Sequence, residues 1–315
     1  MKRSVFLGGM GSALMASSCK SEMPEIRIAL NSWPGYMFLD LAQRRGFFAT
    51  EGLTVKTIFV SSLSDVLQTY QRGQSDIIAS SLIEPMIIAE KTSRPLRIFR
   101  VADSSAGADV LLARPGINSV AELKGKKISA EPQSVDRVTL RLALRSAGLK
   151  STDVELVPLV QQAALEESNA KALDAIQTYP PFSTEWGKRY AFKKIFDTSA
   201  SSGEILDVLS IDRAMDRQYP ELCAQVSRAY DAAYIWYLAN PKAGAEMMLA
   251  TVKAADGSSS ATSADYDMSG LKIYGEADQA GFFRGGALAK SIANYSSIML
   301  EEKMLSRAIA ATEVL

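Results

Sequence analysis

Short apolar strands alternate with amphipathic helices along most of this chain, and this alternation limits the possible folds more than any other feature. In the first unit, Ile26, Ile28 and Leu30 fall at every second position, so they are expected to form one buried face of a strand. Residues 38–48 follow with the periodicity of an amphipathic helix. Repeated units of this kind indicate an α/β protein.

The same plan is predicted to continue as far as residue 211. Further strands are expected at residues 53–60, 76–79, 96–101, 110–113, 127–130, 154–157, 175–177, 192–196 and 205–211, and a helix at 162–172. Two small polar segments, 103–109 and 198–203, interrupt the pattern and are candidate links between two halves of the molecule. Everything after Asp212 has helical periodicity.

The turn after the first strand carries two large aromatic residues, Trp33 and Tyr36, on either side of Pro34 and Gly35. Ligands bind beyond the carboxyl ends of the strands in open α/β sheets, so this turn is a candidate binding element. Packing of both rings against the following helix would explain the same residues equally well.

Composition excludes several classes of function. The chain has 315 residues, enough for about two domains, and it contains no histidine. The commonest general base, the His-dependent hydrolase triads and the histidine-rich zinc sites are therefore absent. The formal net charge is zero, so there is no basic excess of the kind that indicates nucleic-acid binding. We expect no catalytic residues, no metal and no cofactor.

The N-terminus is predicted to be an export signal. Lys2 and Arg3 precede a short apolar stretch, 5–15, and the small residues before Cys19 complete a signal peptide at residues 1–18. This ending resembles the lipobox of bacterial lipoproteins, although Ala16 stands where leucine is usual. Cys19 is therefore a candidate lipidation site, with simple secretion as the alternative. The other cysteine, Cys223, lies in a helical stretch where a small buried hydrophobic role is expected.

These features place the protein outside the cytoplasm. No other stretch reaches the roughly 18 apolar residues of a membrane-spanning helix. We therefore expect a periplasmic protein, or one on the extracellular face, that contacts the membrane only through a lipid anchor.

Five short motifs carry a resemblance to a known family. They are WPGY at 33–36, GFFATEGL at 46–53, GQSDIIA at 73–79, ELKGKKIS at 122–129 and DAIQTYPP at 174–181. In this order and spacing they resemble the periplasmic substrate-binding proteins of ABC importers, specifically the nitrate, sulfonate, taurine and thiamine-precursor (NMT1/THI5-like) group.

The resemblance implies a two-lobed type II periplasmic-binding-protein fold, with two α/β sheets joined by two crossover strands. Lobe one would comprise residues 25–108 and 206–315, and lobe two residues 109–205. The family's mechanism would be closure of the lobes on a small organic ligand. The implied partners are an ABC permease and its ATPase, and the protein would act as a monomer.

The loops that should face the cleft between the lobes supply ten candidate ligand-binding residues. They are Trp33, Tyr36, Ser62, Leu82, Glu84, Asp103, Asp109, Glu131, Ser134 and Tyr179. Helix starts near the two serines suit an anion, unless the serines only cap their helices. Carboxylates with aromatic rings better suit an amine or a neutral heterocycle, since a sulfonate site is expected to contain Arg or Lys and only Arg137 lies nearby. A large apolar ligand is a further alternative.

Two other functions fit the same fold. Some relatives are enzymes of the thiamine-pyrimidine or menaquinone-pathway type, but the missing histidines and the export signal argue against both. An exported sensor would have the same binding site and differ only in its partner.

Overall fold

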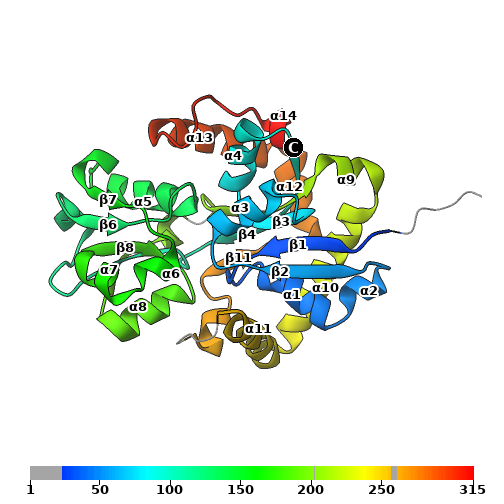
Figure 1. Ribbon diagram of the computed structural model, residues 1–315, viewed down its shortest axis with the longest axis horizontal. Helices are drawn as coiled ribbons and strands as arrows, with labels where there is room; N and C mark the ends of the chain where they lie inside the picture. Colours follow the sequence, from blue (N-terminus) through cyan, green and yellow to red (C-terminus); the bar gives the residue numbers. More distant parts are fainter. Residues whose placement is uncertain (1–22, 202, 257–260) are drawn as a thin grey trace, which may run out of the picture.

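The computed structural model describes residues 23–201, 203–256 and 261–315. The predicted signal peptide, residues 1–18, and the candidate lipidation site, Cys19, lie outside the described residues. Two β-sheets lie next to each other, each with helices on both faces (Figure 1). The predicted alternation of strands and helices is thereby confirmed.

The first sheet has six strands in the order β11-β4-β10-β3-β1-β2. These strands are β1 (Ile26–Leu30), β2 (Val55–Phe59), β3 (Ile77–Ser81), β4 (Leu96–Ser105), β10 (Leu206–Asp212) and β11 (Leu271–Ile273). Strand β1 pairs in parallel with β2 and β3, whereas β10 runs antiparallel to both β3 and β4. The amino end of β10 therefore lies at the same edge as the carboxyl ends of its neighbours.

The second sheet has five strands in the order β7-β6-β8-β5-β9. These are β5 (Val110–Ala113), β6 (Lys127–Ser129), β7 (Glu155–Val157), β8 (Ala175–Thr178) and β9 (Lys193–Asp197). Its helices are α5 (Val135–Ser146), α6 (Gln161–Ala164), α7 (Glu167–Ala172) and α8 (Phe182–Tyr190). We call this sheet with its helices lobe two.

Lobe one is the six-stranded sheet with the remaining helices. They are α1 (Met37–Arg44), α2 (Phe47–Thr50), α3 (Leu63–Gln71), α4 (Ile83–Lys91), α9 (Arg213–Gln218), α10 (Leu222–Ala239), α11 (Pro241–Asp256), α12 (Glu276–Phe283), α13 (Ala287–Glu301) and α14 (Ala311–Val314). Single 3-10 turns lie at η1 (Val120–Leu123), η2 (Ser151–Asp153), η3 (Thr198–Ser201) and η4 (Ser263–Tyr266). Among the described residues, no helix combines the length and apolar character needed to cross a membrane.

The chain passes between the lobes twice, from β4 to β5 and from β9 to β10, and the two passages are hydrogen-bonded to each other. The hydroxyls of Ser105 and Thr198 lie 2.6 Å apart. The Gly107 amide donates to the Thr198 hydroxyl at 3.0 Å, and the Thr198 amide donates to the Asp109 carbonyl at 3.2 Å. The two crossing segments therefore run side by side between the lobes. The two lobes that they join are seen in Figure 1.

The structure corrects the expected elements at several points. The region after Asp212 is not all helical, because β11 pairs with the end of β4. That pairing, together with β10, extends β4 to Ser105, so the first link is shorter than residues 103–109. The predicted helix 38–48 divides at Gly46, whose φ of 75° interrupts the α-helix. The predicted helix 162–172 is likewise two helices, α6 and α7.

Candidate ligand-binding cleft

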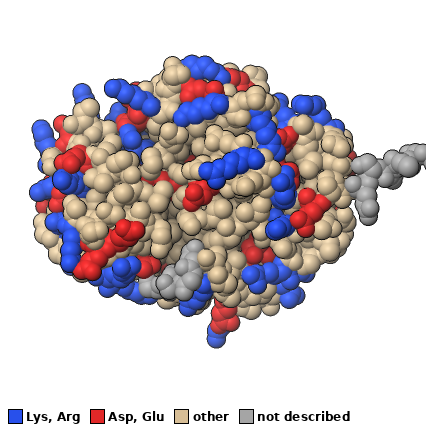
Figure 2. All heavy atoms as spheres, viewed as in Figure 1, with Lys and Arg blue, Asp and Glu red and all other residues tan. Residues whose placement is uncertain are grey.

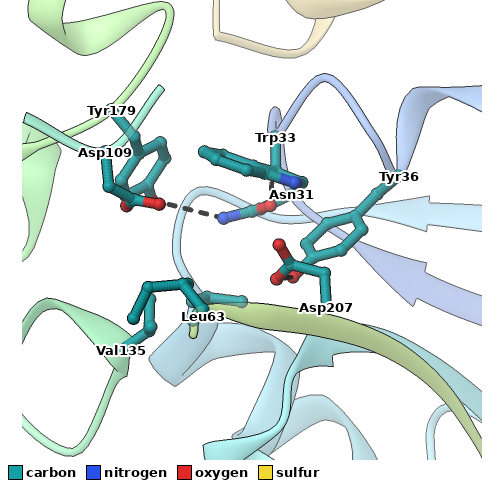
Figure 3. A pocket seen from close by; sticks show the side chains of 9 residues that line it. Asn31, Trp33, Tyr36, Leu63, Asp109, Val135, Tyr179 and Asp207 are labelled. Carbon is teal, nitrogen blue, oxygen red and sulfur yellow. Dashed lines mark hydrogen bonds between the residues drawn. The ribbon is translucent and has the colours of Figure 1, made fainter. Parts of the chain in front are cut away.

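Nine side chains from both lobes enclose a small cavity between the sheets (Figure 3). They are Asn31, Trp33, Tyr36, Leu63, Asp109, Val135, Tyr179, Ile205 and Asp207. The space open to the centre of a water-sized sphere is about 10 Å³, room for about one water molecule. The lobes are therefore closed on each other, and their own side chains nearly fill the cleft.

Three aromatic rings form one side of the cavity. The ring centroids of Trp33 and Tyr36 lie 6.4 Å apart, and Tyr179 from lobe two meets Trp33 edge-on at 5.8 Å. Asn31 fixes this arrangement, because its Oδ1 accepts from the Trp33 amide at 3.1 Å and its Nδ2 donates to the Tyr179 hydroxyl at 3.3 Å (Figure 3). The second of these bonds joins the two lobes directly.

A pair of aspartates lies behind the aromatic turn. Asp103 on β4 and Asp207 on β10 are direct partners in the register of these strands. Trp33 Nε1 donates to Asp103 Oδ1 at 3.0 Å, and the Tyr36 hydroxyl donates to Asp207 Oδ1. Burial raises the pKa of Asp103 to about 6, and burial together with the neighbouring Asp103 charge raises the pKa of Asp207 well above its usual value. The second carboxyl oxygen of each aspartate, Asp103 Oδ2 and Asp207 Oδ2, is buried without a hydrogen-bond partner among the described residues.

Four further carboxyl groups are buried around the cleft. Burial raises the pKa of Asp109 to about 7 and that of Glu84 to about 8. Glu131 accepts from the Ser64 amide of lobe one at 2.8 Å, and Asp136 accepts from Gln161 Nε2 at 2.7 Å. Burial raises the pKa of both Glu131 and Asp136.

Each of these four carboxyl groups has one oxygen without a hydrogen-bond partner among the residues described. Asp109 Oδ1, Glu84 Oε1, Glu131 Oε2 and Asp136 Oδ1 are buried without a partner in the part of the chain that the structure describes. The cavity lining, as far as it is described, contains neither lysine nor arginine. By contrast, acidic and basic side chains are intermixed on the outer surface in Figure 2. Within the described residues, no three His, Cys, Asp or Glu side chains form a group able to hold a metal ion.

Four of the ten predicted site residues line the cavity: Trp33, Tyr36, Asp109 and Tyr179. Asp103 contacts the Trp33 indole, and Glu131 bridges the lobes through Ser64. Glu84 is buried on α4, where it accepts from the Ser81 hydroxyl at 2.7 Å.

The remaining three predicted residues do not line the cavity. Ser62 and Ser134 cap α3 and α5, because their hydroxyls accept from the amides of Asp65 and Asp136. Leu82 is buried before α4, and its amide donates to the Leu206 carbonyl at 2.9 Å.

Five cavity residues were not among the candidates: Asn31, Leu63, Val135, Ile205 and Asp207. The candidates were residues that follow the carboxyl ends of strands, whereas β10 is antiparallel and reaches the cleft with its amino end, where Asp207 lies. One sequence signal pointed to Asp207: it is an acidic residue between two apolar residues, Leu206 and Val208, at the start of a predicted strand.

Comparison with known proteins identifies relatives of the same kind. The model of the family described as NMT1/THI5 like matches residues 33–244. A Brucella abortus protein named as a binding protein is 27% identical over 184 residues, which cover 58% of this chain. The match spans 56% of the length of that relative. The taurine-binding periplasmic protein of Escherichia coli is 24% identical over 208 residues, 64% of this chain and 63% of its own.

Solved structures show the fold. The alkanesulfonate-binding protein SsuA from Xanthomonas axonopodis pv. citri, bound to MOPS, superimposes with a TM-score of 0.74 at 15% identity, covering 94% of this chain and 99% of its own. The desulfurization enzyme DszB superimposes with a TM-score of 0.64 at 15% identity over 92% of this chain and 96% of its own. The predicted two-lobed periplasmic-binding-protein fold is thus confirmed, and the same fold also occurs in an enzyme.

Proposed function

Since the chain belongs to the NMT1/THI5-like family, we propose that it is an extracytoplasmic solute-binding protein that captures a small organic ligand between its lobes. The observation that carries the proposal is the cavity lined by aromatic and acidic side chains from both lobes. An ABC permease and its ATPase are the proposed partners that receive the ligand.

Ligand entry requires the lobes to separate. The cavity of about 10 Å³ has room for about one water molecule, so a larger solute binds the open form and is then enclosed. The paired passages between the lobes are the proposed hinge, because each is a single chain segment. The proposed lobes are residues 25–108 with 206–315 and residues 109–205, and the membership of the strands in the two sheets supports this division.

Within the cleft, Trp33 and Tyr36 from lobe one and Tyr179 from lobe two are the proposed ligand contacts, with Asp109 and Asp207 beside them. An enzymatic role is less well supported. Cys223 is buried on α10, and burial raises the pKa of its thiol to about 12, so the thiolate needed for nucleophilic attack is scarce.

Export and anchoring belong to the same proposal and rest on residues 1–19 of the sequence. A lipid on Cys19 would keep the protein beside its membrane partner. Mass spectrometry of the protein from the membrane fraction should find a lipidated N-terminus at Cys19. An unmodified N-terminus at another residue, in soluble protein, would exclude the anchor.

The cleft is tested by a ligand screen, followed by binding measurements on two tryptophan variants. Taurine, aminopyrimidines and amines are screened by thermal shift, because a solute that binds only the folded form raises the melting temperature. Trp33→Ala should weaken binding of any hit by about thirty- to a thousandfold, the loss typical of a buried aromatic anchor. Trp236→Ala is the matched control, since this tryptophan lies on α10 beneath Arg45. Full affinity in folded Trp33→Ala would place the site elsewhere.

A further inference from the structure

The charge around the cleft has one sign. Six carboxyl groups are each at most 3% exposed, and they come from both lobes: Glu84, Asp103, Asp109, Glu131, Asp136 and Asp207. The neighbouring basic groups are engaged elsewhere. Arg100 binds Asp231 at 2.5 Å and the Tyr274 carbonyl at 2.7 Å, and Arg137 binds Glu302 at 3.2 Å. The cleft therefore contains buried carboxyl groups whose charge is not balanced by Arg100 or Arg137.

The acceptors point at the cavity. Asp109 and Asp207 both line it, and in Figure 3 their carboxyl groups face the space beside Trp33 and Asn31. Asp109 Oδ1 and Asp207 Oδ2 have no hydrogen-bond partner among the described residues. Buried oxygens of this kind stabilise a bound group that donates hydrogen bonds, and in their ionised form they repel an anion.

The aromatic rings further limit the chemical class of ligand that fits the cavity. A cation over the faces of Trp33, Tyr36 or Tyr179 would gain cation–π attraction. A quaternary ammonium would gain this attraction as well, but it has no N–H group for the carboxyl oxygens. A bare metal ion would leave the three rings without a role.

We propose that the ligand is an organic cation that carries N–H groups, such as a protonated amine or an amidine, held between the aromatic rings and the carboxyl groups of Asp109 and Asp207. This assignment rests on the proposed function and names the chemical class of its ligand. It differs from the ligand named for the sulfonate-binding protein of the same fold, whose bound MOPS carries a sulfonate.

Proton release should accompany binding. Burial holds the pKa of Asp109 at about 7, so in the empty, closed protein near neutral pH part of this group is protonated. The carboxyl proton leaves to solvent as the cation takes its place. The titratable groups facing Asp109 and Asp207 from the surrounding elements are the other four buried acids together with Tyr36, Tyr179, Tyr230 and Tyr295.

The experiment compares probes that share one ring and differ in charge. Benzylamine, benzamidine, benzyltrimethylammonium and toluenesulfonate, with taurine and calcium chloride, are titrated into the protein by calorimetry at low salt. Benzylamine and benzamidine should bind at least about tenfold more tightly than either the quaternary or the sulfonate analogue. Titration in two buffers of different ionisation enthalpy should show protons released on binding.

Matched variants locate the effect. Asp109→Asn and Asp207→Asn keep the side-chain shape and should each weaken benzylamine or benzamidine by about tenfold or more. Glu246→Gln removes the same charge from an exposed position on α11 and should leave affinity unchanged. The comparison between probes uses the unmodified protein, so it stands even if a variant does not fold.

The outcomes separate the two proposals. Preference for toluenesulfonate, taurine, the quaternary probe or calcium, with binding still lost in Trp33→Ala, would overturn the ligand class and leave the binding cleft in place. Binding of benzylamine that is unchanged in Trp33→Ala, Asp109→Asn and Asp207→Asn would overturn the site itself and with it the proposed function. Failure of both N–H cations to bind at millimolar concentration would overturn the ligand class.

Discussion

At the scale of single residues, Gly35 shows how closely the aromatic turn approaches its acidic neighbours. A Cβ atom at this position would lie 2.0 Å from Asp103 Oδ2 and 2.6 Å from its carboxyl carbon. The Gly35 carbonyl also accepts from the Tyr230 hydroxyl at 2.9 Å, which holds the turn against α10. The absence of a side chain therefore lets Trp33 reach Asp103.

Gly35→Ala should displace either the turn or the Asp103 carboxylate and cost about 1–3 kcal/mol of unfolding free energy, as overpacking of a core does. Urea unfolding measures this cost. Gly281→Ala is the matched control, because its added Cβ meets nothing within 4 Å on helix α12 and should be neutral or stabilising. Equal stability of the two variants would show that the turn yields without strain.

The buried acids also predict how stability depends on pH. The pKa values of Asp103, Asp109 and Glu84 are raised by burial to about 6, 7 and 8, above unfolded values near 4. The folded protein therefore binds more protons than the unfolded chain in this range. The stabilisation is complete below about pH 4 and is lost as pH rises through about 6 to 8.

Melting temperatures measured from about pH 5 to about pH 9 should therefore fall in the ligand-free protein. Asp109→Asn should flatten this fall, because the asparagine does not ionise, and its advantage over the unmodified protein should grow with pH. A difference in melting temperature that stays constant across this range would contradict the raised pKa of Asp109.

At the scale of elements, helices α5 and α13 join the two lobes at one rim of the cleft. Arg137 binds Glu302 at 3.2 Å, and Arg141 binds Glu301 at 3.0 Å and Glu302 at 3.3 Å. The Ser151 hydroxyl adds a bond to Glu302 at 2.7 Å. Figure 1 shows α13 above the sheets on the side of α5. Since α5 belongs to lobe two and α13 to lobe one, opening the cleft must break these ion pairs.

Glu302→Gln should weaken the closed form by about 1 kcal/mol, because Arg137 and Arg141 are partly exposed to solvent although the Glu302 side chain is largely buried. Without ligand, the radius of gyration from X-ray scattering should be larger for Glu302→Gln than for the unmodified protein. High salt should increase the radius of the unmodified protein in the same way. Glu167→Gln is the control, since that glutamate pairs with Lys171 within α7. An unchanged radius in Glu302→Gln would show that these pairs do not hold the lobes together.

The sequence predicted elements better where the signal is local. Short apolar stretches located nearly every strand of both sheets, and serines marked the starts of α3 and α5. Strand β11 was missed, because its three residues form a strand only by pairing with β4. The same limit applies to the site: Trp33 and Tyr179 follow their strands in sequence, whereas Asp207 reaches the cleft through the antiparallel direction of β10.

At the scale of the whole molecule, the two-lobed arrangement was predictable from the order of motifs, but the closure of the lobes was not. One continuous group of buried apolar side chains includes residues of both lobes, among them Trp33 and Leu63 of lobe one and Tyr179 of lobe two. Such long-range packing leaves no periodic trace in the sequence. Contacts that depend on it, such as Ser64 with Glu131, could be found only from the structure.

The nearly filled cavity also bears on signal fidelity. An importer that reads lobe closure as evidence of cargo would waste ATP on every empty protein that closes. In this chain, empty closure sequesters six acidic groups away from water without a counter-charge, which becomes more costly as the groups ionise. A cationic solute would supply the missing counter-charge and so remove this free-energy cost of closure. The same buried acids that select the ligand would then keep the empty protein from closing. This effect would be strongest at high pH, where the acids are ionised.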